Sequence, residues 1–540
     1  MKGRFHIPED TRSDQARASD PKTSAWVSAN AGSGKTHVLA QRVIRLLLDG
    51  VDPSRVLCLT YTRAAASNMA NRIFETLARW TRLDDDDLAG AIAETGGKAP
   101  SVAMLRDARR LFARALETPG GLKIQTIHAF CEAVLHQFPL EANIAGHFEL
   151  LEGSTEAALM AEARRDMITG TAADGNAALA EAFAVVLSIG NEFGLDELLE
   201  EIVRDRDGIR RFIDAISDGS PRFPALFQEF GFTEEDGEAG IAAYAWPLPG
   251  FDPDQLREFL RVAREEDART VLKNIAPGVE MALMESDPVL RLNYLCEGFL
   301  KADGEAYNPA SALKKAMYDR LPDLAERYHA AAEALMATAD RLALFRSLVA
   351  TRAALVIADW LIARYEQLKA ARGFLDFNDL IERTIRLLSR SDAGPWVQYK
   401  LDRGIDHILI DEAQDTSPEQ WQVVRKLAEE FFAGFGAREA ANRTIFAVGD
   451  EKQSIYSFQG ARPEEFDMNG HDFSARVAAA ERRFERVKLQ RSFRSTGDVL
   501  SAVDLVFALE TVRKGLTHDP ESIEHKPIRV GAPGYVELWP

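Results

Sequence analysis

The chain has 540 residues, of which 46% are hydrophobic and 28% are charged, and its formal net charge is −19. This length allows roughly three to four domains, and the composition excludes a disordered chain. The acidic balance argues against a surface that binds nucleic acid broadly, so any such contact must come from a local channel. Residues 1–10 lack the apolar core of a secretory signal, and we expect no membrane-spanning stretch. These features predict a folded cytoplasmic protein.

The three cysteines are distributed singly along the chain. Cys58, Cys131 and Cys296 form no CxxC pair and have no histidines at the spacing of a metal site. We therefore expect them to be small core residues and not metal ligands.

A glycine-rich loop near the N-terminus carries the strongest chemical signal. An apolar run at 25–27 predicts a buried strand, and apolar residues at helical spacing after residue 37 predict a helix. Between them lies the phosphate-binding pattern Ala29, Asn30, Ala31, Gly32, Ser33, Gly34, Lys35 and Thr36. Backbone N–H groups of such a loop surround the β- and γ-phosphates, while Lys35 adds positive charge and the Thr36 hydroxyl ligates Mg²⁺. The loop predicts binding of ATP with Mg²⁺, although Ala29 stands where the strict pattern has glycine.

Polar and aromatic residues follow two further predicted strands. The strand at 56–59 leads into Tyr61, Thr62 and Arg63, and the strand at 122–124 leads into Thr126 and His128. Ligands of doubly wound sheets bind beyond the carboxyl ends of strands, where such side chains can meet a nucleic-acid backbone. Taken singly, a solvated strand end or a structural histidine is the simpler interpretation.

The strand signals fade between residues 150 and 370. Apolar residues recur there at helical spacing, for example at Leu195, Leu198, Leu199, Ile202 and Val203. The segment predicts an inserted helical body, interrupted by a loop-rich stretch around the prolines between 221 and 253.

Residues suited to ATP hydrolysis follow the strands of the last third of the chain. The apolar strand at 407–410 ends in Asp411 and Glu412. Asp411 can hold Mg²⁺ through water, and Glu412 can orient and deprotonate the attacking water. After the strand at 445–448, Gln453 can contact both the γ-phosphate and that water. A strand ending at residue 489 precedes Arg494, a suitable finger for charge on the transferred phosphoryl group.

Two aromatic residues follow Gln453. Tyr456 and Phe458 offer ring faces on which bases can stack, at about 1–3 kcal/mol each. Either ring is also compatible with a place in the core, and the sequence leaves both interpretations open.

In this order, the motifs resemble those of superfamily 1 helicases of the UvrD/Rep/RecB kind, and most closely the AddA family of helicase-nuclease subunits in its alphaproteobacterial form. The motifs lie at 29–36, 60–69, 126–130, 375–380, 411–416, 449–461 and 492–496. The resemblance implies that Gln15 reads adenine, that Phe493 stacks on it, and that His37 replaces an arginine common against its other face. It also implies that Gln453 couples nucleotide state to DNA. The residues that it places against single-stranded DNA are Tyr61, Thr62, Arg63, Thr126, His128, Tyr456 and Phe458, while Gln459 replaces a common arginine.

The resemblance implies an α/β fold built on a RecA-like P-loop lobe, a parallel sheet with helices on both faces. The lobe is expected at 1–149 and 371–483, a helical insertion at 150–370, and the start of a second RecA-like lobe at 484–540. The final helicase motifs and the AddA nuclease motif do not occur before Pro540. We therefore expect an N-terminal portion of a longer protein that does not unwind duplex DNA alone. An AddB-like subunit is the implied partner.

Three functions remain open at this point. The first is an ATP-driven motor on single-stranded DNA in double-strand-break repair, with 3′-to-5′ movement implied by the resemblance. The second is a DNA-binding scaffold or assembly module that binds ATP without motor activity. The third, a P-loop enzyme acting on a small molecule, leaves the motifs at Tyr61 and Tyr456 unexplained.

Overall fold

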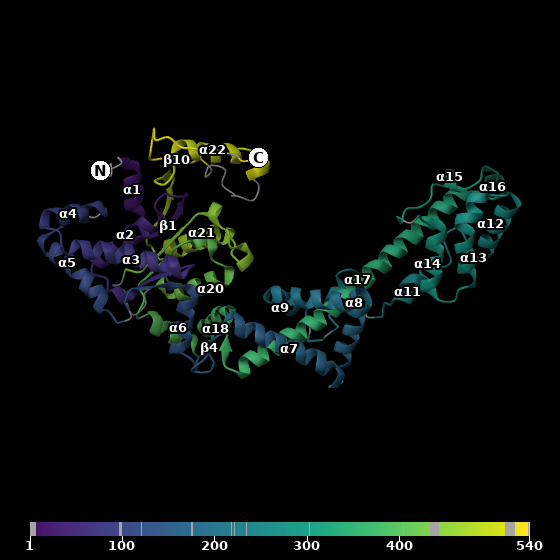
Figure 1. The fold of residues 1–540 in the computed structure, drawn as a ribbon, viewed down its shortest axis with the longest axis horizontal. Helices are drawn as coiled ribbons and strands as arrows, with labels where there is room; N and C mark the ends of the chain where they lie inside the picture. Colours follow the sequence, from purple (N-terminus) through teal and green to yellow (C-terminus); the bar gives the residue numbers. More distant parts are fainter. Residues whose placement is uncertain are drawn as a thin grey trace. The chain divides into compact units, whose positions relative to one another are not determined.

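The computed structural model describes residues 7–96, 100–119, 121–173, 176–217, 219–220, 222–233, 235–301, 303–402, 404–432, 442–513, 524–537 and 539. The chain forms two compact units (Figure 1). The first, the sheet unit, combines Met1–Leu151 with Gly373–Pro540, and the second, the helical unit, is Glu152–Arg372.

The sheet unit is built on six parallel strands in the order β3-β2-β6-β7-β1-β8. The strands are β1 (Ser24–Ala29), β2 (Val56–Thr60), β3 (Lys123–Thr126), β6 (His407–Ile410), β7 (Thr444–Gly449) and β8 (Phe484–Leu489). Parallel strands need a crossover between each pair, and helices supply these crossovers. The predicted α/β class with a parallel sheet is confirmed.

Helices cover both faces of this sheet. One face carries α1 (Glu9–Ala18), α2 (Lys35–Leu48), α3 (Arg63–Trp80), α4 (Asp85–Glu94) and α5 (Val102–Glu117). The other carries α6 (Ile127–Gln137), α18 (Phe377–Ser389), α19 (Gly394–Asp402), α20 (Pro418–Leu427) and α21 (Glu464–Ala479). Because successive strand residues face opposite sides, Ala25 and Val27 of β1 enter one core while Trp26 enters the other. There Trp26 stacks on Trp421 at 5.6 Å.

Strand β8 corrects one predicted boundary. The sequence interpretation assigned residues from 484 onward to a second lobe, but β8 pairs in parallel with β1 from Ser24↔Phe484 to Ala29↔Leu489. It is therefore an edge strand of the first sheet. The following elements are β9 (Arg491–Ser492), α22 (Gly497–Phe507), α23 (Glu510–Arg513) and β10 (Lys526–Pro527), with β9 and β10 paired in parallel.

The helical unit is inserted between two short strands. β4 (Glu149–Leu150) and β5 (Phe374–Leu375) pair in parallel, so the chain leaves the sheet unit and returns to it at neighbouring points. The inserted helices are α7 (Gly153–Ala173), α8 (Ala177–Arg204), α9 (Arg206–Ile216), α10 (Pro224–Gln228), α11 (Glu238–Ala243), α12 (Pro253–Glu265), α13 (Ala276–Met284), α14 (Pro288–Phe299), α15 (Pro309–Ala312), α16 (Lys315–Arg320) and α17 (Leu324–Ala371). The 48-residue helix α17 packs on most of the others (Figure 1).

Helix α8 differs from one sequence prediction. By length and composition it could cross a membrane, although we expected no such stretch. Its most apolar window is 17% buried, and its backbone breaks at Asn191, where φ is 55° and ψ is −159°. A single helix of this kind does not identify a membrane protein, because core helices of globular proteins satisfy the same criterion.

A buried histidine at the amino end of β6 makes folding sensitive to acid. His407 is 2% exposed, and its Nδ1 lies 2.8 Å from the Thr444 hydroxyl. Burial, with the nearby charge of Arg42, lowers the pKa of His407 to about 4. An unfolded imidazole titrates near 6.5, so the unfolded chain binds a proton at a higher pH than folded His407 does. The free energy of unfolding is therefore unaffected by His407 above pH 6.5 and decreases as the pH falls from there to about 4.

We expect wild type to lose roughly 2–3 kcal/mol more unfolding free energy than His407→Asn between pH 7 and pH 4.5. Asparagine keeps a polar atom near Nδ1 and does not titrate. Urea unfolding of both proteins at both pH values measures the difference. Equal losses would show that His407 is not held neutral in the folded protein.

Candidate nucleotide and DNA site

Six of the seven predicted motifs follow strands of the six-stranded sheet and lie at one edge of it. β1, β2 and β3 lead into residues 30–36, 61–63 and 126–128, whereas β6, β7 and β8 lead into 411–415, 450–453 and 490–494. Because the six strands are parallel, their carboxyl ends meet at the same edge. The fold therefore gathers segments that are hundreds of residues apart in sequence.

The glycine-rich loop has the backbone that its glycines permit. Gly32 and Gly34 have φ of 72° and 94°, in the left-handed region that favours glycine. A Cβ at Gly32 would lie 2.6 Å from the Cβ of Arg494, so only glycine allows this approach. Within the described chain no side chain caps α2, which leaves its first N–H groups to an anion. Ala29 is the last residue of β1 and does not have the positive φ that requires glycine, so a small residue such as alanine fits this buried position.

Three residues that the resemblance assigns to adenine gather beside Gly34. A Cβ built there would lie 3.6 Å from Gln15 Nε2, 3.8 Å from the Phe493 ring and 3.9 Å from His37 Cβ. Among the described residues, Gln15 Nε2 and Ser33 Oγ are buried without a hydrogen-bond partner. Burial and the charge of Arg72 lower the pKa of His37 to about 4, so the imidazole is neutral at pH 7. Buried polar atoms without partners fit a site that a polar ligand completes.

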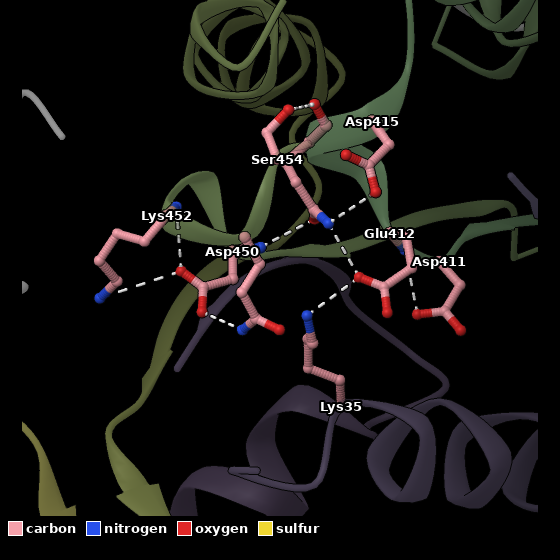
Figure 2. A network of polar contacts seen from close by, with 9 residues as sticks. Lys35, Asp411, Glu412, Asp415, Asp450, Lys452 and Ser454 are labelled. Atoms are coloured by element: carbon pink, nitrogen blue, oxygen red, sulfur yellow. Dashed lines mark hydrogen bonds and ion pairs between the residues drawn. The ribbon is translucent and has the colours of Figure 1, made fainter. Parts of the chain in front are cut away.

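The paired carboxylates lie beside the lysine of the loop. Asp411 is 4% exposed, and burial together with the charge of Glu412 raises its pKa to about 6. Lys35 Nζ is 2.9 Å from Glu412 Oε2 (Figure 2). Burial opposes ionisation of Glu412, but the charge of Lys35 and hydrogen bonds from Gln414 and Lys35 hold its pKa below the usual value. Glu412 itself has φ of 49°, an uncommon conformation for a residue other than glycine.

The predicted γ-phosphate residues, Gln453 and Arg494, also follow strands at this edge. The charge of Arg494 contributes to the lowered pKa of Glu412. The Nε2 of Gln453 donates a hydrogen bond to the carboxylate of Asp450. Asn30 Oδ1 accepts a 2.7 Å hydrogen bond from Lys452 Nζ.

A ladder of aromatic rings lies next to these carboxylates. Tyr61 and Tyr456 have ring centroids 4.5 Å apart, and Tyr456 lies 6.0 Å from Phe458. Phe458 is 77% exposed, which excludes the core interpretation for this residue. Burial and the charge of Asp415 raise the pKa of Tyr61 to about 12. The side chain of Gln459 lies outside the described residues.

The remaining predicted DNA residues have local structural contacts. Thr62 and Thr126 accept hydrogen bonds from Ala65 N and Ala129 N, and so cap α3 and α6. His128 is half-buried, and burial lowers its pKa. Its ring meets Phe377 edge to face at 5.3 Å. Arg63 is exposed at the start of α3.

Phe377 was missed as an individual site residue. It is exposed at the start of α18 and lies inside the 375–380 motif, which the resemblance included without assigning it a role. The sequence signal that could have identified Phe377 is its place two residues after β5, inside one of the motifs that carry the resemblance. Its ring forms a second aromatic pair with His128, which follows β3.

The residues present are compatible with Mg²⁺ bound together with a phosphate. Thr36 and Asp411 supply a hydroxyl and a carboxylate, ligand types that Mg²⁺ prefers. No group of three or more His, Cys, Asp or Glu residues in the described chain could hold a metal alone. Mg²⁺ commonly binds through one or two protein groups plus phosphates and water, so a small protein donor set is sufficient.

Comparison with known proteins identifies the family. The model of the UvrD/REP helicase N-terminal domain matches residues 10–474. The chain belongs to the UvrD/REP helicase family. The loop after β1 and the carboxylates after β6 both fall within the matched residues of this UvrD/REP chain.

Relatives of this UvrD/REP chain include the AddA subunit of the ATP-dependent helicase/nuclease of Lacticaseibacillus casei, 27% identical over 517 residues, 92% of this chain and 39% of that protein. The AddA protein from Pelotomaculum thermopropionicum is 29% identical over 523 residues, 89% of this chain and 37% of that protein. The one from Latilactobacillus sakei is 25% identical over 543 residues, 93% and 55% respectively. The predicted AddA resemblance is confirmed at low identity, and the chain spans 37–55% of the length of these relatives.

Proposed function

We propose that this chain is the ATP-binding part of an ATP-dependent DNA helicase that moves on single-stranded DNA in double-strand-break repair. One observation carries the proposal: the phosphate loop, the paired carboxylates and an aromatic ladder with Phe458 exposed share one edge of the sheet. An ATPase that acts on a small molecule has no need for the ladder. A cytoplasmic location, predicted from the sequence features, is part of the proposal. An AddB-like partner and 3′-to-5′ movement, which come from the resemblance, are also part of it.

ATP binding is assigned to the loop and its surroundings. In the proposal, N–H groups of residues 31–36 bind the phosphates. Lys35 leaves its ion pair with Glu412 and pairs with the phosphates instead. Gln15 donates its free Nε2 hydrogens to the base, and Phe493 and His37 flank it. A neutral His37 adds ring contact without charge.

Hydrolysis is assigned to the groups at the ends of β6, β7 and β8. Mg²⁺, when bound, offsets negative charge on the phosphates during transfer. Asp411 and Thr36 would hold it. Glu412, whose lowered pKa keeps it ionised, takes a proton from the attacking water, and Arg494 compensates charge on the γ-phosphate. Gln453 must leave Asp450 in order to reach the γ-phosphate.

DNA binding is assigned to the aromatic ladder. Tyr61, Tyr456 and Phe458 present rings on which successive bases can stack without sequence preference. His128 and Phe377 form a separate aromatic pair, to which the proposal assigns a further DNA contact. Hydroxyls of Thr62 and Thr126 accept hydrogen bonds as helix caps, and each keeps its own hydrogen to donate to a phosphate.

The ladder gives a direct test of DNA binding. We expect the double variant Tyr456→Ala and Phe458→Ala to weaken single-strand affinity by about 10-fold or more, since stacking contributes about 1–3 kcal/mol per base. ATP affinity of the free protein should remain near normal. Fluorescence anisotropy with a labelled oligonucleotide and titration with a fluorescent ATP analogue measure the two affinities.

A second exposed aromatic pair is the matched control. Trp396 and Tyr399 stack at 6.2 Å on α19, the helix that leads to the amino end of β6. Replacing both with alanine should leave single-strand affinity unchanged. Equal loss of ATP and DNA affinity in the Tyr456 and Phe458 variant would indicate a damaged core and contradict the assignment.

The scaffold function differs from the motor in turnover alone. It requires the same ATP and DNA surfaces but no catalytic carboxylate. The ionised Glu412 beside Lys35 favours the motor. ATP hydrolysis that rises with single-stranded DNA separates the motor from both alternatives.

A further inference from the structure

A buried glutamine connects the hydrolytic carboxylate to the residues beneath the aromatic ladder. Gln414 is 1% exposed and lies in the short 3-10 helix Ala413–Asp415. Its Nε2 donates to Glu412 Oε2 at 2.9 Å and to Asp415 Oδ2 at 3.1 Å. The two hydrogens of this amide group thus go to two different carboxylates, Glu412 and Asp415, which are labelled in Figure 2.

The other side of the amide holds the segment after β7. Gln414 Oε1 accepts the N–H of Asp450 at 2.9 Å. Because a backbone N–H only donates and an ionised carboxylate only accepts, these contacts fix which end of the amide is nitrogen. Gly449 allows the approach, since a Cβ there would lie 2.9 Å from Gln414 Oε1.

Each partner of Gln414 leads to a different ligand surface. Glu412 contacts Lys35 of the phosphate loop. Asp450 holds Gln453, the residue proposed to reach the γ-phosphate. On the DNA side, the Ser454 hydroxyl donates to the Gln414 carbonyl at 3.4 Å, two residues before Tyr456. Asp415 lies near Tyr61, whose ring contacts Tyr456.

We propose that Gln414 is a positioning residue that couples single-stranded DNA on the aromatic ladder to nucleotide in the phosphate loop. It touches neither ligand, and the inference rests on the function proposed above. A shift of Tyr61 and Tyr456 on DNA binding moves Asp415 and Ser454, and the shared amide passes this movement to Glu412 and Asp450. Both of its amide hydrogens and its carbonyl oxygen are engaged with different segments, so a displacement of one partner acts on the others through the same amide group.

Thermodynamic coupling tests this role without requiring turnover. Affinity of the chain for a fluorescent ATP analogue with Mg²⁺ is measured with and without a saturating oligonucleotide, and affinity for the oligonucleotide is measured with and without nucleotide. Coupling of this kind typically changes affinity by about 5–150-fold, and the factor must be the same in both directions. We expect at least about 5-fold for the wild-type chain.

Gln414→Met keeps the length of the side chain and removes its hydrogen bonds. We expect it to bind each ligand alone within about 3-fold of wild type while the coupling factor falls below about 2-fold. Gln414→Asn, which keeps a polar amide but is one methylene too short to reach Glu412, Asp415 and Asp450 together, should lose coupling in the same way. This second variant keeps the test decisive where methionine does not fold.

The matched control is Gln420→Met, which removes another buried glutamine amide close by. Gln420 closes the capping box of α20 with Ser417 and has no contact with Glu412 or Asp450 among the described hydrogen bonds. It should retain wild-type coupling.

The outcomes separate this inference from the proposed function. Failure of the wild-type chain to bind Mg-ATP or single-stranded DNA contradicts the proposed function. If both bind, an uncoupled wild type, wild-type coupling in the Gln414 variants, or equal loss in Gln420→Met overturns the role of Gln414.

Discussion

Replacing Lys35 with alanine is expected to abolish ATP hydrolysis and to weaken ATP binding by about 10–100-fold or more. A charged hydrogen bond contributes about 1.5–3 kcal/mol, and Lys35 is the cation that the loop itself directs at the phosphates. The change also leaves Glu412 without its ion-pair partner at 2.9 Å. Titration with a fluorescent ATP analogue and steady-state release of phosphate measure the two effects.

Lys22→Ala is the control for this substitution. Lys22 is exposed and lies two residues before β1, at the opposite end of the strand from the loop. Its removal should change neither binding nor hydrolysis. Unchanged hydrolysis in Lys35→Ala would show that the loop at 29–36 is not the site of ATP hydrolysis.

Replacing Glu412 with glutamine should lower ATP hydrolysis by about 10²–10⁴-fold while ATP still binds. Glutamine keeps the shape and cannot accept the proton of the attacking water. Because Glu412 occupies Lys35 in the absence of nucleotide, loss of its charge frees Lys35, and ATP affinity should stay equal or increase. Single-turnover hydrolysis and equilibrium binding measure the two effects separately.

Glu382→Gln, on the exposed face of α18, is the matched change and should have no effect on either measurement. Loss of ATP binding together with turnover in Glu412→Gln would give Glu412 a structural role. The binding measurement is needed because Glu412 has a positive φ and therefore also shapes the turn after β6.

The sequence was sufficient to predict the gathering of motifs at one edge. Apolar runs such as 407–410 predict buried strands, and parallel strands place whatever follows them on the same side. The approach of Arg494 to Gly32, from opposite ends of the chain, follows from this rule once β8 is known to pair with β1.

Other features depend on contacts that no local pattern specifies. The pairing of β8 with β1 is set by tertiary contact, so a boundary placed at residue 484 by motif order was wrong. Gln414 lies in a motif that the sequence interpretation assigned to its carboxylates. The role proposed for Gln414 depends on its hydrogen bond to Asp450, which follows a different strand. Thr62 and Thr126 were predicted as DNA contacts from their place after strands, and helix capping explains the same residue type there equally well.

The most direct test of the central claim is the rate of ATP hydrolysis by the purified protein with and without single-stranded DNA. We expect hydrolysis that depends on Mg²⁺, rises when single-stranded DNA is added, and is lost in Lys35→Ala. A rate that single-stranded DNA leaves unchanged would contradict the claim that one edge of this sheet joins an ATP site to a DNA surface.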